Sequence, residues 1–257
     1  MEAGPPRPEV RIDRDGPLAV VTVDRPGTRN AFGPDTLHHV ASVIRHATDD
    51  GIRALVLTGA GEVSFSSGMD LKALASAPRE QLSAAVEAFD AAMDAAERPP
   101  LIAAVNGAAT GGGFEIALRC DLVVAADHAT FGLPEVRRGI VPGGRGTLLP
   151  SRIPIAVALE IGIVGEPISA ARAYELGLVN RVVSAPELLD VARDLGRRIA
   201  ANGPLAVART RALMWTAATE SAALAWEETR RVRDDPGLAR EMREGVTAFL
   251  EKRSPRW

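Results

Sequence analysis

The sequence predicts an α/β fold, and two observations lead to that prediction. Apolar segments of strand length alternate with helical patterns through residues 1–150, and the apolar segments have no regular polar positions. A strand that is covered on both faces has no polar side, so it is continuously apolar instead of alternating. The composition, with 46% hydrophobic and 25% charged residues, is that of an ordinary globular protein.

The elements of the first 150 residues follow in order. Residues 1–9 are proline-rich and are predicted to be a disordered tail. Four apolar runs that end at Pro, Gly or Asp are predicted to be strands: 18–26, 53–61, 98–107 and 122–127. Helices are predicted between them at 35–47 and 83–96, and residues 63–74 are predicted to be a loop that leads into a short helix.

The pattern changes after residue 150. The segment "ISAARAYELGLVNRVVS" predicts a helix that stops at Gly177, followed by a short strand. From residue 186 onward only helical patterns occur: 187–201, 205–216, 222–232 and 238–252. We therefore predict three regions: a tail at 1–9, an α/β core with the active site at 10–185, and a helical region at 186–257.

Charge and cysteine content exclude several classes of function. The net charge is −3 and no run of five or more basic residues occurs, so nucleic acid is not an expected partner. The single cysteine, Cys120, excludes an internal disulfide and is typical of a reducing cytosol. We expect no signal peptide, no membrane span and no metal site, because the sequence has no apolar run of sufficient length and no Cys/His cluster.

The segment "NGAATGGGFEIALRCD", residues 106–121, is unusual because three glycines precede a helical pattern that carries Glu115. Each glycine in a helix costs about 1 kcal/mol relative to alanine. The glycines could simply permit a tight turn. A nucleotide-binding loop is excluded, because neither the G-x-G-x-x-G nor the G-x-x-x-x-G-K-[ST] spacing occurs. A third interpretation is an oxyanion site, in which free backbone N–H groups at a helix start bind developing negative charge.

Two other segments fit an oxyanion site. The segment "FSSGMD", residues 65–70, follows the second predicted strand and could supply another N–H donor, although Asp70 could also be only a helix cap. The segment "FGLPEVRRGIVPGG", residues 131–144, carries Glu135 in a loop rich in Gly and Pro. Two carboxylates beside such a site can divide acid and base work, whereas either one alone is typical of a solvated surface acid.

Together these segments resemble the enoyl-CoA hydratase/isomerase family, the crotonase-like proteins. The resemblance extends over nearly the whole chain, through "DRPGTRNAF", "VLTGAG", "FSSGMDLKAL", "IAAVNGAATGGGFEIALRCDLVVAA", "FGLPEVRRGIVPGG", "ISAARAYELGLVNRVV" and "FLEKR". It implies a spiral of ββα units with a C-terminal helical trimerisation region, in a homotrimer or homohexamer. It also implies an enzyme that acts on acyl-CoA thioesters and has no cofactor apart from the coenzyme A of its substrate. From the cysteine content we expect a cytoplasmic location.

The resemblance assigns roles to residues as well. The backbone N–H groups of Met69 and Gly112 would bind the thioester oxygen, while Glu115 and Glu135 would activate water and protonate the α-carbon. A side chain at Gly112 would crowd the thioester, and the helix dipole would add positive potential there. The substrate-binding residues that it implies are Thr28, Arg29, Ser67, Gly68, Asp70, Leu71, Lys72, Gly111, Pro134 and Gly143.

The reaction itself stays open among several alternatives, because one fold can carry many chemistries. Both acids favour an enoyl-CoA hydratase, a hydro-lyase. An isomerase would need only Glu135, and a thioester hydrolase also fits the fold. A non-catalytic crotonase-like scaffold would be expected to lack one or both acids. Ser66 and Ser67 do not stand in a G-x-S-x-G motif, so they are not expected to be nucleophiles.

Arg145 departs from the family pattern, which usually has a small residue at this point of the loop. It could be a surface residue that points to solvent. It could instead pair with Glu135 and lower the pKa of that acid. A third alternative is that it binds a carboxylate on the acyl group of the substrate, for which a guanidinium is well suited.

Overall fold

The centre of the molecule is a six-stranded sheet with the order β1-β2-β3-β5-β7-β10. The structure is a computed structural model that describes residues 9–233 and 235–257, without the side chains of residues 71 and 74. The strands are β1 (Val10–Asp15), β2 (Leu18–Val23), β3 (Ala54–Gly59), β5 (Leu101–Val105), β7 (Leu122–Ala126) and β10 (Arg181–Val183). Strand β1 runs antiparallel to β2, and the other neighbouring pairs are parallel. The predicted α/β class is confirmed.

A second, smaller sheet lies at the ends of the large strands. Its strands, in the order β4-β6-β8-β9, are β4 (Ser64–Ser66), β6 (Ala108–Thr110), β8 (Thr130–Gly132) and β9 (Ile168–Ser169). Each of β3, β5 and β7 is followed within a few residues by a strand of this sheet, and the chain then continues into helical structure. This is the ββα repeat that the sequence led us to expect, although its short strands were not predicted individually.

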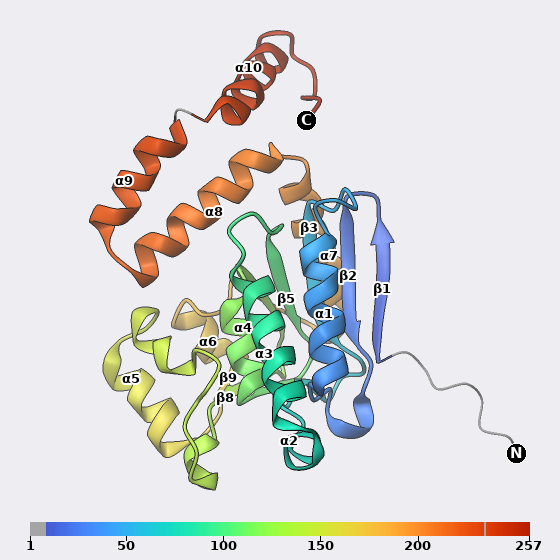
Figure 1. The fold of residues 1–257 in the computed structure, drawn as a ribbon, viewed down its shortest axis with the longest axis vertical. Helices are drawn as coiled ribbons and strands as arrows, with labels where there is room; N and C mark the ends of the chain where they lie inside the picture. The colour runs from blue at the N-terminus through green and yellow to red at the C-terminus, as the bar shows by residue number, and fades with distance from the viewer. Residues whose placement is uncertain (1–8, 234) are drawn as a thin grey trace, which may run out of the picture.

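Ten α-helices surround the sheets in the described part of the chain, and Figure 1 shows their arrangement. They are α1 (Pro34–His46), α2 (Leu71–Ser76), α3 (Arg79–Asp94), α4 (Gly112–Arg119), α5 (Ile155–Leu159), α6 (Ala170–Glu175), α7 (Leu188–Ala200), α8 (Pro204–Thr219), α9 (Ala222–Arg233) and α10 (Pro236–Leu250). Helices α1 and α3 pack against each other, and β3 and β5 are buried along their full length. None of the helices in residues 9–233 and 235–257 is long and apolar enough to cross a membrane.

Helix α7 belongs to the packing of the core, because it contacts β2, β3, β5 and β7. Its buried residues Leu188, Ala192, Gly196 and Ala200 recur every four positions and form one face. A Cβ atom at Gly196 would lie 2.6 Å from Leu18 Cδ1, so glycine permits the close approach of helix and sheet. The predicted boundary between the α/β core and the helical region, at residue 185, therefore separates α7 from the sheet that it covers. Of the predicted tail, residues 1–8 lie outside the described residues.

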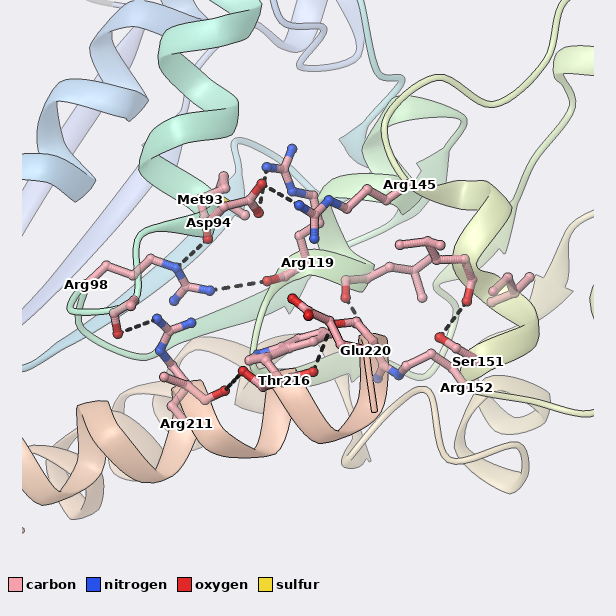
Figure 2. A pocket seen from close by; sticks show the side chains of 17 residues that line it. Met93, Asp94, Arg98, Arg119, Arg145, Ser151, Arg152, Arg211, Thr216 and Glu220 are labelled. Atoms are coloured by element: carbon pink, nitrogen blue, oxygen red, sulfur yellow. Dashed lines mark hydrogen bonds and ion pairs between the residues drawn. The ribbon is translucent and has the colours of Figure 1, made fainter. Parts of the chain in front are cut away.

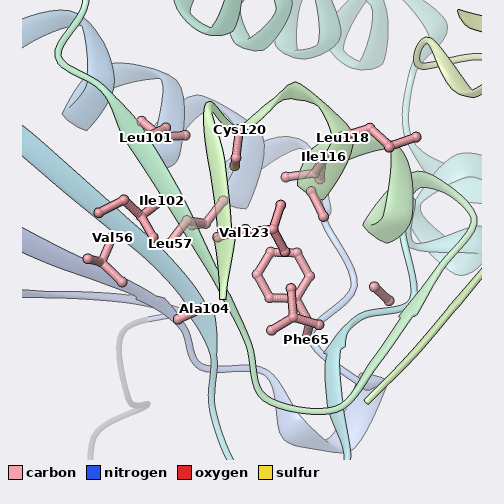
Figure 3. Packing of buried hydrophobic residues seen from close by; sticks show 14 of the residues in the cluster. Val56, Leu57, Phe65, Leu101, Ile102, Ala104, Ile116, Leu118, Cys120 and Val123 are labelled. Carbon is pink, nitrogen blue, oxygen red and sulfur yellow. The ribbon is translucent and has the colours of Figure 1, made fainter. Parts of the chain in front are cut away.

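Figure 3 shows how apolar side chains of β3 and β5 pack beside those of α4. Cys120 ends α4 within this cluster and is 1% exposed. Burial raises the pKa of its thiol to about 12, so the thiol stays protonated and acts as a small apolar group.

The C-terminal helices are connected to the core through α8. The indole Nε1 of Trp215 donates a hydrogen bond to Asp121 Oδ1 at 2.8 Å, and Arg211 Nη2 donates to the carbonyl oxygens of Ala95 and Ala96. Helices α9 and α10 follow at the upper end of the molecule, beyond α8 and away from the large sheet (Figure 1).

Candidate active site

The structure requires glycine at each of the three consecutive positions, for a different reason at each. Gly111 precedes α4 with φ +57°, in the left-handed region that glycine adopts most easily. A Cβ atom at Gly112 would lie 3.1 Å from Gly68 Cα, so the two backbones are in close contact. A Cβ atom at Gly113 would lie only 2.1 Å from the carbonyl oxygen of Ser66. Gly113 therefore serves packing, and Gly112 lies opposite the "FSSGMD" segment.

The N–H groups of Met69 and Gly112 are both available at this contact. Phe32 N donates to Gly68 O at 2.8 Å and Asp70 N donates to Phe32 O at 2.9 Å, so the backbone groups on either side of Met69 are bonded, while its own N–H has no acceptor among the described residues. Gly112 is the first residue of α4, whose N–H has no acceptor within the helix. A Cβ atom at Gly112 would lie 3.4 Å from Met69 N, and two free N–H groups this close together can bind an oxyanion.

Glu115 lies in the first turn of α4 and is 5% exposed. Its Oε1 accepts two backbone hydrogen bonds, from Gly144 N at 2.8 Å and from Gly146 N at 2.7 Å. Glycine at both positions keeps the backbone close, because a Cβ atom at either would lie 2.9 Å from a carboxylate oxygen of Glu115. The carboxylate is therefore held in one orientation by the loop that follows Glu135.

Glu135 begins a short 3-10 helix, Glu135–Arg138, and is also buried, with 9% exposure. Its Oε2 atom has no hydrogen-bond partner among the described residues. Burial raises the pKa of this carboxyl group above its usual value, and the nearby charge of Glu115 raises it further. The environment of Glu135 thus favours the protonated form of its carboxyl group.

These groups line one cavity of about 720 Å³. The predicted residues that line it are Thr28, Arg29, Ser67, Gly68, Met69, Asp70, Lys72, Gly111, Gly112, Glu115, Pro134, Glu135 and Gly143. Leu71 begins α2 beside them, and its side chain lies outside the described part of the structure. The fold therefore brings together the three segments 65–70, 106–121 and 131–144 and places them around both acids.

Asp70 has the capping role that the sequence left open. Its carboxylate accepts hydrogen bonds from Lys72 N and Ala73 N at the start of α2 and pairs with Arg25 Nη2 at 3.0 Å. Burial opposes ionisation, but these hydrogen bonds outweigh it and lower the pKa of Asp70. Asp70 thereby fixes the "FSSGMD" turn that presents Met69.

Arg145 is placed for neither of the two interactions considered for it, an ion pair with Glu135 or a contact with the acyl group of the substrate. Its Nη2 atom contacts Asp94 Oδ2 at 2.5 Å, and the described ion pairs include none between Arg145 and Glu135. Its side chain lines a separate cavity of about 260 Å³ between α3, α4 and α8, not the cavity that holds the two acids. Figure 2 shows this second cavity, with Arg145 beside Asp94. The carboxylate of Asp94 accounts for the direction that the guanidinium takes.

The sequence did not reveal several groups of the site. Gly144 and Gly146 act through backbone N–H groups, which no residue type identifies. The apolar wall of the cavity comes from α1, α3 and the segment before α1: Phe32, Leu37, Val86 and Phe89. These residues have the spacing of ordinary core positions, so their sequence pattern alone did not separate them from the core.

Comparison with known proteins gives the same family. The enoyl-CoA hydratase/isomerase family model matches residues 13–257. A carnitinyl-CoA dehydratase of Salmonella arizonae is 39% identical over 255 residues, covering 96% of this chain and 97% of that protein. Crystal structures of enoyl-CoA hydratases from Mycobacterium marinum and Mycobacterium tuberculosis H37Rv each have a TM-score of 0.88 and 38% identity, covering 98% of this chain and 99% of theirs. The chain therefore belongs to the enoyl-CoA hydratase/isomerase family and is an enzyme of the lyase class.

Proposed function

We propose that this enzyme adds water across the 2,3 double bond of a 2-enoyl-CoA thioester, and removes it in the reverse direction. The observation that carries the proposal is the pairing of two buried glutamates in one cavity beside two free backbone N–H groups. A hydro-lyase needs these groups together: an oxyanion site for the thioester, a base for water and an acid for the α-carbon.

The geometry suggests how the groups divide the work. The N–H groups of Met69 and Gly112 would polarise the thioester carbonyl and make the β-carbon electrophilic. Glu115, whose Oε1 accepts two N–H hydrogen bonds, is held as an acceptor and would take a proton from water as the water oxygen bonds to the β-carbon. The double-bond electrons move through the enolate, and Glu135, with its raised pKa, would donate a proton to the α-carbon.

The remaining lining residues support binding of the coenzyme A part. Thr28, Arg29 and Lys72 line the same cavity as the acids, and both Arg29 and Lys72 are exposed. Two exposed cations suit the phosphates of coenzyme A. We assign this binding role to them, together with Ser67 and the backbone of residues 68–71.

The alternatives predict different products or different residues. An isomerase would move the double bond and would not need the double N–H hydrogen bond to Glu115. A hydrolase would release free coenzyme A, and a scaffold would need neither buried acid. Incubation with crotonoyl-CoA decides between them: loss of the enoyl-thioester absorbance with formation of a 3-hydroxyacyl-CoA supports hydration. Free coenzyme A, detected by mass spectrometry, or a shifted double bond, detected by NMR, would contradict it.

A second candidate substrate is carnitinyl-CoA, because relatives with that name are 39% identical over nearly the whole chain. Its acyl end carries a quaternary ammonium group, and the cavity wall includes Asp90, whose carboxylate is 48% exposed. The same carboxylate pairs with Arg119 Nη1 at 2.5 Å, which largely offsets its attraction for a cationic acyl end, so the similarity to these relatives carries the suggestion. Parallel measurement of kcat/KM for carnitinyl-CoA dehydration and crotonoyl-CoA hydration distinguishes the two substrates.

We also propose assembly as a homotrimer or homohexamer, and a cytoplasmic location. Assembly is supported by large apolar side chains that are more than half exposed on α8 to α10: Met214, Trp226, Met242, Val246, Phe249 and Leu250. Apolar surface of this extent is typical of a protein interface.

A further inference from the structure

Arg145 has a backbone conformation that disfavours its own side chain. Its φ of 85° and ψ of 9° lie in the left-handed region, which glycine adopts at much lower cost than a residue with a Cβ atom. It stands between Gly144 and Gly146, the two residues whose N–H groups bind Glu115 Oε1. A glycine here would permit the same turn, so the arginine side chain must be explained by its contacts.

The side chain of Arg145 connects the loop to the end of α3. Its Nη2 atom contacts Oδ2 of Asp94, the last residue of α3, at 2.5 Å. The other carboxylate oxygen of Asp94 accepts a hydrogen bond from Arg119 Nη2 at 3.1 Å. Figure 2 shows both guanidinium groups beside the Asp94 carboxylate.

Arg119 completes the connection back to the catalytic helix. It is the last residue of α4, one turn after Glu115, and is 7% exposed. Its guanidinium also binds Asp90 Oδ1 at 2.5 Å and lies 5.6 Å from the centre of the Phe89 ring. The end of α3 is thereby fixed to α4, and the loop that holds the Glu115 carboxylate is fixed to the end of α3.

We propose that Arg145 is a positioning residue for Glu115. Through Asp94 it holds residues 144–146 so that the N–H groups of Gly144 and Gly146 stay on the Glu115 carboxylate. The proposal rests on the proposed hydratase function for its activity measurements. The Arg145 and Asp94 side chains are 45% and 38% exposed, and exposed ion pairs contribute little to overall stability. The effect of breaking this pair is therefore expected in turnover and not in the melting temperature.

Arg145→Gly tests the proposal, because it removes the side chain and keeps the left-handed turn favourable. We expect kcat for crotonoyl-CoA to fall by about tenfold, with KM changed less than about twofold, because small displacements of a catalytic group reduce turnover strongly. Arg145→Lys, which keeps a cation for Asp94, should recover most of the loss. The control is Arg14→Ala, which removes a similarly exposed ion pair to Asp50 far along the chain and should leave kcat unchanged.

Two further measurements show whether Arg145 acts through Glu115. Hydrogen exchange of the Gly144 and Gly146 amides should accelerate in Arg145→Gly and not in Arg14→Ala. In a Glu115→Gln background, Arg145→Gly should not lower the residual rate further. Unchanged kcat with unchanged exchange, equal losses in Arg145→Lys and Arg145→Gly, or additive losses with Glu115→Gln would each overturn the proposal. If the unaltered enzyme hydrates no 2-enoyl-CoA and dehydrates no carnitinyl-CoA, the proposed function fails, while amide exchange still tests the positioning.

Discussion

Glu115 and Glu135 line the same cavity but have opposite hydrogen-bonding environments. Glu115 Oε1 accepts two backbone N–H groups, at 2.8 and 2.7 Å, whereas Glu135 Oε2 has no partner among the described residues. Burial and the charge of Glu115 raise the pKa of Glu135. Two carboxyl groups whose environments differ in this way are suited to separate roles as base and acid.

Glu115→Gln is expected to lower turnover of a 2-enoyl-CoA by roughly 10²–10⁴-fold, because it removes a general base. The amide oxygen of glutamine can still accept the N–H groups of Gly144 and Gly146, so the loop should keep its position. Steady-state kinetics and coenzyme A binding by calorimetry measure the two effects separately. Glu87→Gln, an exposed position on α3, is the matched control. Near-normal turnover of Glu115→Gln would contradict the two-acid mechanism and favour an isomerase that uses Glu135 alone.

Glu135→Gln is expected to stabilise the fold at neutral pH while reducing activity. The pKa of Glu135 is raised in the folded state, so the folded state binds this proton more tightly than the unfolded state. Between the ordinary and the raised pKa the stability of the wild-type enzyme therefore falls as pH rises, and above both values the cost is fully present. Glutamine carries no charge and avoids this cost.

The measurement for Glu135 is thermal unfolding as a function of pH. The melting temperature of Glu135→Gln should exceed that of the wild type at pH 7, and the difference should disappear below the ordinary carboxyl pKa of 4.5. Glu80→Gln, at an exposed position in the first turn of α3, should show no such pattern. A difference that is independent of pH would show that ionisation of Glu135 is not its cause.

Alanine substitutions at Gly112 and Gly113 should have different effects. At Gly113 a Cβ atom would lie 2.1 Å from Ser66 O, so Gly113→Ala should lower the melting temperature markedly. At Gly112 it would lie 3.1 Å from Gly68 Cα and 3.4 Å from Met69 N, which a small backbone shift can accommodate. Gly112→Ala should therefore fold but lose most activity, because the methyl group lies beside the two N–H donors. Full activity in a folded Gly112→Ala variant would exclude the oxyanion role.

The central strands of the large sheet, β2, β3, β5 and β7, were predictable because they are buried and continuously apolar. The second sheet was not, because β4, β6, β8 and β9 have only two or three residues each and are too short to show a period. Likewise, strand β1 is exposed at five of its six positions and has no apolar pattern. Short or exposed strands depend on backbone pairing, which amino-acid side chains encode weakly.

The lining of the candidate site was predictable where distinctive side chains or glycines mark it, as at Glu115, Glu135 and Gly112, which all line the cavity. It was not predictable where the partner is a backbone group or a distant side chain. Arg145 stood out in the sequence as an unexpected residue, but its partner Asp94 lies 51 positions earlier. Only the packing of α3 beside α4 brings the two together.

Assembly provides the last prediction. The apolar side chains of α10 need a protein surface to cover them, and Phe249 is the most exposed of them at 81%. We expect trimers or hexamers in multi-angle light scattering at micromolar concentration. Phe249→Asp should shift the population toward smaller species, because burying a charge in an apolar interface is costly. Lys252→Asp, an exposed position just after the same helix, changes charge without removing apolar surface and should assemble normally. A wild-type monomer would contradict the proposed assembly, and an unchanged Phe249→Asp oligomer would show that the interface lies on another face.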